Sequence, residues 1–84
     1  MEQLVDAVTA NNADVLARMI QLAARGSLQI VELHMLAEDD QRAHIHMRVA
    51  CQEPKQVWRF IQQAEKLVDT YEVRTPTVNN IFAH

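Results

Sequence analysis

Apolar side chains occupy every second position over two stretches in the middle of the chain, residues 31–35 and 45–51. Because side chains on a β-strand point alternately to opposite faces, each stretch predicts a half-buried strand, and we place these strands at Leu28–Leu36 and Ala43–Cys51. The charged segment Glu38–Arg42 between them predicts a hairpin loop. One antiparallel register keeps both apolar sets on the same face: Val31 opposite Val49, Leu33 opposite Met47, Met35 opposite Ile45, Glu32 opposite Arg48 and His34 opposite His46.

The residues before this hairpin predict a strand followed by a helix. Gln3–Ala10 alternates in the manner of a strand, and we expect Val5 and Ala7 to face the core. Apolar residues then recur at helical spacing over Ala13–Arg25. A pair of asparagines precedes this segment, and asparagine is a favoured helix N-cap. Gly26 follows it, where a residue with left-handed backbone conformation commonly ends a helix.

The residues after the hairpin predict a second helix and a short last strand. Pro54 suits the first position of a helix, because that position leaves its N–H unbonded anyway. We expect this helix to end at Asp69-Thr70 and a strand to follow at Tyr71–Arg74. The helix carries an apolar stripe, made of Val57, Trp58, Ile61, Ala64, Leu67 and Val68.

The predicted order is strand, helix, strand, strand, helix, strand. Two right-handed strand–helix–strand halves of this kind interleave into one four-stranded antiparallel sheet with both helices on one face. The fold class is therefore α+β and ferredoxin-like, with the first and third strands central and the second at an edge. We assign residues 1–76 to this domain and residues 77–84 to a C-terminal tail that contains Ile81 and Phe82.

The edge position of the second strand predicts self-association. An edge strand exposes unpaired backbone groups, and pairing with a second copy of the chain would satisfy them. We expect a homodimer in which the self-association edge includes Ile30, Glu32 and His34.

Composition narrows the possible environments and partners. The 84 residues are 49% hydrophobic and 23% charged, as in an ordinary globular domain with one core. Cys51 is the only cysteine, no run is apolar enough to span a bilayer, and the first residues lack the blocks of a signal peptide, so we expect a cytoplasmic protein that binds no membrane. The net charge is −3 and the eight basic residues are spread along the chain, which argues against a nucleic-acid partner.

Few residues indicate metal binding or catalysis. His34, His44 and His46 share one face of the hairpin, but Cys51 points to the other face, so a tetrahedral zinc site would lack ligands and we assign no metal. The same parity places Cys51 in the core. The chain has no G-x-S-x-G sequence and no glycine-rich phosphate loop, so we expect no catalytic residues. Trp58 and Phe60 flank the stripe of the second helix, and they are compatible either with the edge of the core or with an exposed patch that binds a partner.

Two stretches resemble a known family. Residues 63–73, Gln-Ala-Glu-Lys-Leu-Val-Asp-Thr-Tyr-Glu-Val, are similar to the segment Gln-Leu-x-Lys-Leu-x-Asp-Val-x-x-Val of the small regulatory subunits of acetolactate synthase, also called acetohydroxyacid synthase. Residues 11–18, Asn-Asn-Ala-Asp-Val-Leu-Ala-Arg, continuing to Arg25-Gly26, resemble the ACT-domain signature Asn-x-Pro-Gly-Val-Leu-x-Arg…Arg-Gly. The short chain and the sequence Leu33-His34-Met35 look most like the single-domain small subunits of the isozyme II type.

The resemblance implies a regulatory subunit without catalysis of its own. In that family the large catalytic subunit binds thiamine diphosphate, magnesium and FAD and condenses pyruvate with a second 2-ketoacid in branched-chain amino acid synthesis. The small subunit binds and activates it, and this chain would carry no cofactor. A freestanding ACT-like domain that binds an amino acid is the alternative that the resemblance leaves open.

In valine-sensitive relatives, valine binds at the loop between the first strand and the first helix. The resemblance therefore implies an effector site made of Asn11, Asn12, Ala13, Asp14, Val15 and Leu16. Asp14 stands where the family has a glycine that lets a carboxylate approach the backbone amides. We therefore expect this chain to be insensitive to valine.

Overall fold

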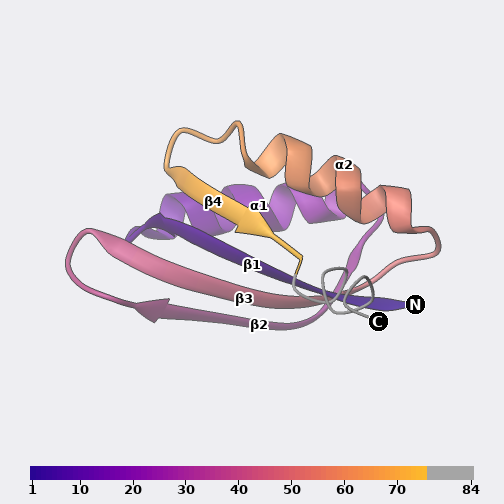
Figure 1. The fold of residues 1–84 in the computed structure, drawn as a ribbon, viewed down its shortest axis with the longest axis horizontal. Coiled ribbons are helices and arrows are strands. Elements are labelled where there is room, and N and C mark those ends of the chain that lie inside the picture. The colour runs from indigo at the N-terminus through magenta and orange to yellow at the C-terminus, as the bar shows by residue number, and fades with distance from the viewer. Residues whose placement is uncertain (76–84) are drawn as a thin grey trace.

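A computed structural model describes residues 1–75 and shows one antiparallel sheet with both helices on the same face (Figure 1). The strands lie in the order β2-β3-β1-β4, so the first and third strands are central and the second is at an edge. This confirms the predicted ferredoxin-like fold. The tail at residues 77–84, with Ile81 and Phe82, lies outside the described residues. The elements are β1 (Glu2–Ala10), α1 (Ala13–Arg25), β2 (Gln29–Ala37), β3 (Arg42–Ala50), α2 (Pro54–Ala64) and β4 (Thr70–Arg74).

The core lies between the inner face of the sheet and the two helices. The central strands supply alternate side chains to it, including Val5 and Ala7 as predicted. Each helix contributes residues at three- and four-residue spacing, because these positions share one face. Cys51 is also buried, as its parity predicts. Further core residues are Val15, Met19, Ala23, Ile45, Met47, Val49, Val57, Phe60, Ile61 and Ala64.

The hairpin register is as predicted over most of its length but not at its open end. Leu33 pairs with Met47, Met35 with Ile45, Glu32 with Arg48 and His34 with His46. A bulge between Ile30 and Glu32 then shifts the register, so that Ile30, not Val31, lies opposite Val49. The predicted Val31–Val49 pair is therefore wrong. The extra residue reverses which side chains face inward, so Ile30 packs against the core and Val31 is 43% exposed.

The end of α1 also differs from the prediction. Gly26 has φ −83° and ψ 7°, and Ser27 instead takes the left-handed conformation, with φ 60°. The Leu28 N–H donates to the carbonyl of Ala23 at 2.9 Å, and the Ser27 N–H donates to that of Ala24 at 3.1 Å. These two bonds form a Schellman-type helix end. The left-handed residue falls at Ser27 because the residue after it, Leu28, then enters the core, where it is buried.

The second helix is shorter than predicted and buries a different aromatic residue. It ends at Ala64, and turns connect it to β4 at Thr70. Phe60 is buried, whereas Trp58 is 47% exposed and Val68 is 84% exposed. The predicted stripe is therefore wrong at Trp58 and Val68. Since successive helical residues are about 100° apart, Trp58 lies beside the face that Val57 and Phe60 share.

Candidate functional site

The turn between β1 and α1 is built around two asparagines. Ala10 ends the strand, and Asn12 has an extended backbone with φ −145° and ψ 157°. Its side-chain Oδ1 accepts a hydrogen bond from the Val15 N–H at 3.0 Å. This is the N-cap predicted from the sequence. It satisfies one of the amides that the first turn of a helix would otherwise leave unbonded.

Two loops that are distant in the sequence hold this turn in place. The Asn11 side chain donates to the Asp39 carbonyl at 2.9 Å, and the Asn11 N–H donates to the Gln41 carbonyl at 3.0 Å, both in the β2–β3 loop. The Asn12 amide donates to the Asp69 carboxylate at 3.2 Å, just before β4. Both side-chain amides therefore act as structural braces. A ligand that needed the amide of Asn12 would have to compete with Asp69 for it.

The β2–β3 loop is itself fixed by an aspartate. The Oδ1 atom of Asp39 accepts from the Gln41 N–H at 2.7 Å and from the Arg42 N–H at 2.8 Å. The hydrogen bond from the Gln41 backbone, then that from Arg42, hold the pKa of the Asp39 carboxyl below its ordinary value, because they stabilise the ionised form. The same residue offers its carbonyl to Asn11, so the hairpin tip positions the β1–α1 turn.

The other residues of the implied effector site have different environments. Ala13 and Asp14 are exposed, and the Asp14 carboxylate pairs with Arg18 at 3.4 Å. Val15 is buried in the core and Leu16 packs against it. The solvent-exposed polar groups of this segment therefore lie at the start of α1, and Asp14 is in the first turn of that helix.

The face of the sheet that the helices leave uncovered carries the three histidines. His46 Nδ1 lies 2.9 Å from Asp6 Oδ1, His44 Nε2 lies 3.0 Å from Glu38 Oε1, and His34 Nε2 lies 3.5 Å from Glu32 Oε2. The rings of His44 and His46 stack with centroids 6.3 Å apart. Each histidine thus pairs with its own carboxylate. Within residues 1–75, no group of three or more His, Cys, Asp or Glu side chains could hold a metal ion.

A small hollow on the same face lies beside Asp6, His46 and Arg74. Its volume is about 110 Å³. Sites for small organic ligands are commonly about 300–1,000 Å³. The hollow is therefore smaller than a common site for a small organic ligand.

The predicted self-association edge lies on β2, which pairs only with β3 among the described strands. Glu32 and His34 are exposed, and Ile30 is half-buried against the core. The bulge beside Ile30 interrupts the edge near its start. The stretch with regular pairing geometry therefore runs from Glu32 to Ala37.

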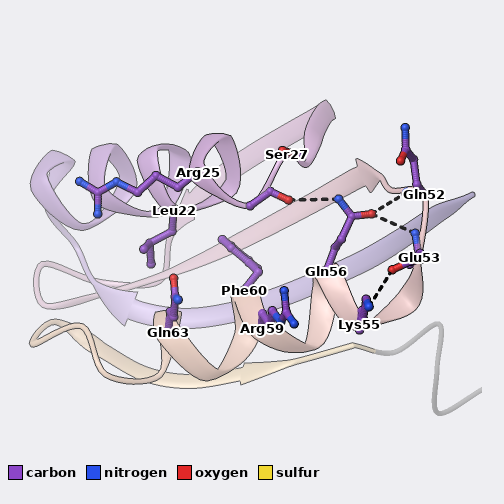
Figure 2. Close-up of a pocket in the computed structure, with 11 residues that line it drawn as sticks. Leu22, Arg25, Ser27, Gln52, Glu53, Lys55, Gln56, Arg59, Phe60 and Gln63 are labelled. Carbon is purple, nitrogen blue, oxygen red and sulfur yellow. Dashed lines mark hydrogen bonds and ion pairs between the residues drawn. The ribbon is translucent and has the colours of Figure 1, made fainter.

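A groove between the two helices was not predicted. It has a volume of about 660 Å³ and lies where the end of α1 approaches the start of α2 (Figure 2). The Gln56 side chain spans this junction: its Nε2 donates to the Gly26 carbonyl at 3.1 Å, and its Oε1 accepts from the N–H groups of Gln52 and Glu53 at 2.7 and 2.9 Å. Leu22 and Phe60 point toward one another between the helices. Three of the chain's eight basic residues line the groove: Arg25, Lys55 and Arg59.

Comparison with solved structures identifies the fold. The ACT domain of the GTP pyrophosphokinase of Chlorobium tepidum superposes with a TM-score of 0.77 at 8% identity, over 89% of this chain and 96% of that one. An ACT domain protein from Streptococcus pneumoniae superposes with a TM-score of 0.71 at 11% identity, over 94% and 93%. The fold is that of an ACT domain. No family model matches the sequence, and a search of curated proteins found no match.

A small subunit of acetolactate synthase is among the similar structures. The protein from Thermotoga maritima superposes with a TM-score of 0.75 at 24% identity. The match covers 89% of this chain and 47% of the Thermotoga chain, so this chain spans about half the length of that subunit. None of the helices in residues 1–75 is long and apolar enough to cross a membrane.

Proposed function

We propose that this chain is a regulatory small subunit of an acetolactate synthase, which binds the thiamine-diphosphate-dependent large subunit and raises its activity. The observation that carries the proposal is the resemblance of residues 63–73 to these small subunits, in a chain with the ACT fold. The structural likeness to the Thermotoga subunit supports it. The closer assignment to the isozyme II type rests on the sequence resemblance alone.

The mechanism we propose is a shift between conformations of the large subunit. A regulator raises activity when it binds the active conformer more tightly than the inactive one, and the size of the effect equals that difference in affinity. This chain would contribute a rigid docking surface and no reacting group. Thiamine diphosphate, magnesium and FAD would all lie on the large subunit.

Co-purification with the cognate large subunit tests the proposal. The two proteins, expressed together with an affinity tag on the large subunit only, are expected to elute as one complex. The complex is expected to form acetolactate faster than the large subunit alone. A folded sample of this chain that neither co-elutes nor changes the rate would refute the proposal.

We propose that valine does not inhibit this complex. The Asp14 side chain is 75% exposed and lies at the start of α1, where the carboxylate of valine would bind. Two negative charges about 4 Å apart repel by roughly 1 kcal/mol in water, and more where solvent is excluded. The ion pair with Arg18 offsets part of this repulsion. The acetolactate-forming rate is therefore expected to stay constant up to millimolar valine, and a saturable loss of rate would contradict this.

The second candidate is a freestanding ACT domain that binds a small amino acid. Two observations favour it: the Streptococcus ACT domain protein is matched over 93% of its length, and hydrogen bonds of Asn11 and Asn12 tie the β1–α1 turn to two other loops. Calorimetry with branched-chain amino acids, in the absence of a large subunit, separates the candidates. Binding heat without any activation of a large subunit would favour the second.

A further inference from the structure

The helix groove differs in charge from the rest of the chain. The sequence carries 11 acidic and eight basic residues. Among the residues that line the groove, however, Arg25, Lys55 and Arg59 are basic and Glu53 is the one acidic residue. Glu53 pairs with Lys55 at 3.2 Å. The groove therefore has a net positive charge on a chain that is negative overall.

The two arginines of the groove are available to a partner. Within residues 1–75, neither Arg25 nor Arg59 forms an ion pair or side-chain hydrogen bond, whereas Arg18, Arg48 and Arg74 each pair with a carboxylate. Both side chains are exposed, one at the end of α1 and one on α2. An unpaired guanidinium group offers several N–H donors that match a carboxylate in geometry.

The groove also has apolar and neutral polar parts. Phe60 is 2% exposed and Leu22 is half-buried, and Figure 2 shows the two side chains lying between the helices. Gln63 and Ser27 line the same groove. An apolar floor with cations on the rim fits a segment that has an apolar side chain and carboxylates near it.

We propose that this groove is the docking site for an acidic segment of the large catalytic subunit. Arg25 and Arg59 bind its carboxylates, and an apolar side chain of the segment lies against Leu22, which packs beside the buried Phe60. The inference rests on the proposed function, because it names the surface through which the regulatory subunit would act. The charge of the groove selects an acidic partner. A second copy of this chain could dock there only through its own acidic residues, and the experiment below distinguishes that case.

A pair of charge reversals tests the docking site. Arg59→Glu alters the groove, and Lys66→Glu makes the same change of charge at an exposed residue just beyond α2 that has no ion pair within residues 1–75. Binding of each purified variant to the immobilised large subunit is measured by surface plasmon resonance. We expect Arg59→Glu to weaken binding about tenfold or more, since like charges across an interface are strongly unfavourable, and Lys66→Glu to change it less than about threefold.

Two further measurements keep the result specific. Arg25→Gln removes the charge of the other arginine without opposing the dipole of α1, and we expect it to weaken binding severalfold. Raising the salt from about 50 to about 300 mM should weaken binding of the unchanged chain more than that of Arg59→Glu, because screening acts on the charges that the variant has lost. Thermal unfolding of each variant confirms that it is folded.

The outcomes separate the inference from the proposed function. Equal binding by Arg59→Glu, Lys66→Glu and the unchanged chain would overturn the docking site and leave the proposed function intact. No binding by the unchanged chain would overturn both. A change in the oligomeric mass of Arg59→Glu by light scattering, without loss of binding to the large subunit, would show that a second copy occupies the groove and would also overturn the inference.

Discussion

Whether Gly26→Ala stabilises or destabilises the fold depends on which residue at the end of α1 has the left-handed conformation. If Gly26 were left-handed, as its position in the sequence indicates, then Gly26→Ala would cost about 1–2 kcal/mol. The structure gives Gly26 φ −83° and ψ 7°, which any residue can adopt. A Cβ atom there would lie 3.5 Å from the Leu22 carbonyl oxygen, an ordinary contact. We therefore expect Gly26→Ala to stabilise the fold.

The size of the effect follows from the unfolded chain. Alanine has less backbone freedom than glycine, so replacing glycine without strain stabilises a protein by about 0.4–1 kcal/mol. Ser27 has φ 60°, and a glycine at this position would remove the cost of a left-handed L-residue. Ser27→Gly should therefore also stabilise the fold, by up to about 1 kcal/mol. Neither substitution removes the Gly26 carbonyl that accepts from Gln56.

Urea unfolding of the unchanged chain and three variants measures both effects. The midpoints of Gly26→Ala and Ser27→Gly are expected to exceed that of the unchanged chain at equal slope, which means a change in stability alone. Ser27→Ala serves as the control, because it removes the hydroxyl and keeps the left-handed strain. A loss of about 1 kcal/mol or more in Gly26→Ala would refute the assignment of Ser27 as the left-handed residue.

Three other substitutions or conditions test separate parts of the fold. Asn12→Ala should cost about 1–2 kcal/mol in urea unfolding, since it removes a helix cap and a brace to Asp69, whereas Asn12→Ser keeps the cap and should cost less. The pKa of Asp39 is lowered in the folded state, so its ionised form stabilises the fold above the unfolded pKa, and this contribution is lost as pH falls through the folded pKa. The stability advantage of the unchanged chain over Asp39→Asn should therefore shrink from about pH 6 to about pH 3. A constant difference in stability would contradict this. Ile45→Val in the core should cost about 0.5–1.5 kcal/mol and Ile20→Val on the exposed side of α1 clearly less.

Much of the fold could be predicted because the alternation of apolar residues determines which face of each strand is buried. It places Leu33 and Met35 inward and pairs His34 with His46, as the structure confirms. The bulge could not be predicted, because Ile30 and Val31 are both apolar and either could begin the buried row. The prediction of a left-handed Gly26 was wrong because the end of the helix also depends on where Leu28 packs, which is a tertiary contact.

The candidate sites depend on contacts between residues far apart in the sequence. Asn12 was predicted as a cap, but its bond to Asp69, 57 residues away, has no local signal. The bases appeared scattered because Arg25 and Arg59 lie on different helices, and only the packing of α1 against α2 places them on one groove. The sequence alone indicates only that Lys55 and Arg59, four residues apart on one helix, share a face of that helix.

We propose that this chain acts on a catalytic partner. The most direct test titrates a fixed amount of the cognate large subunit with this chain and follows acetolactate formation. We predict a rate that rises and saturates as the complex forms, at a level that this chain alone cannot produce. A rate that stays flat across the titration, with folded protein at both ends, would contradict the account.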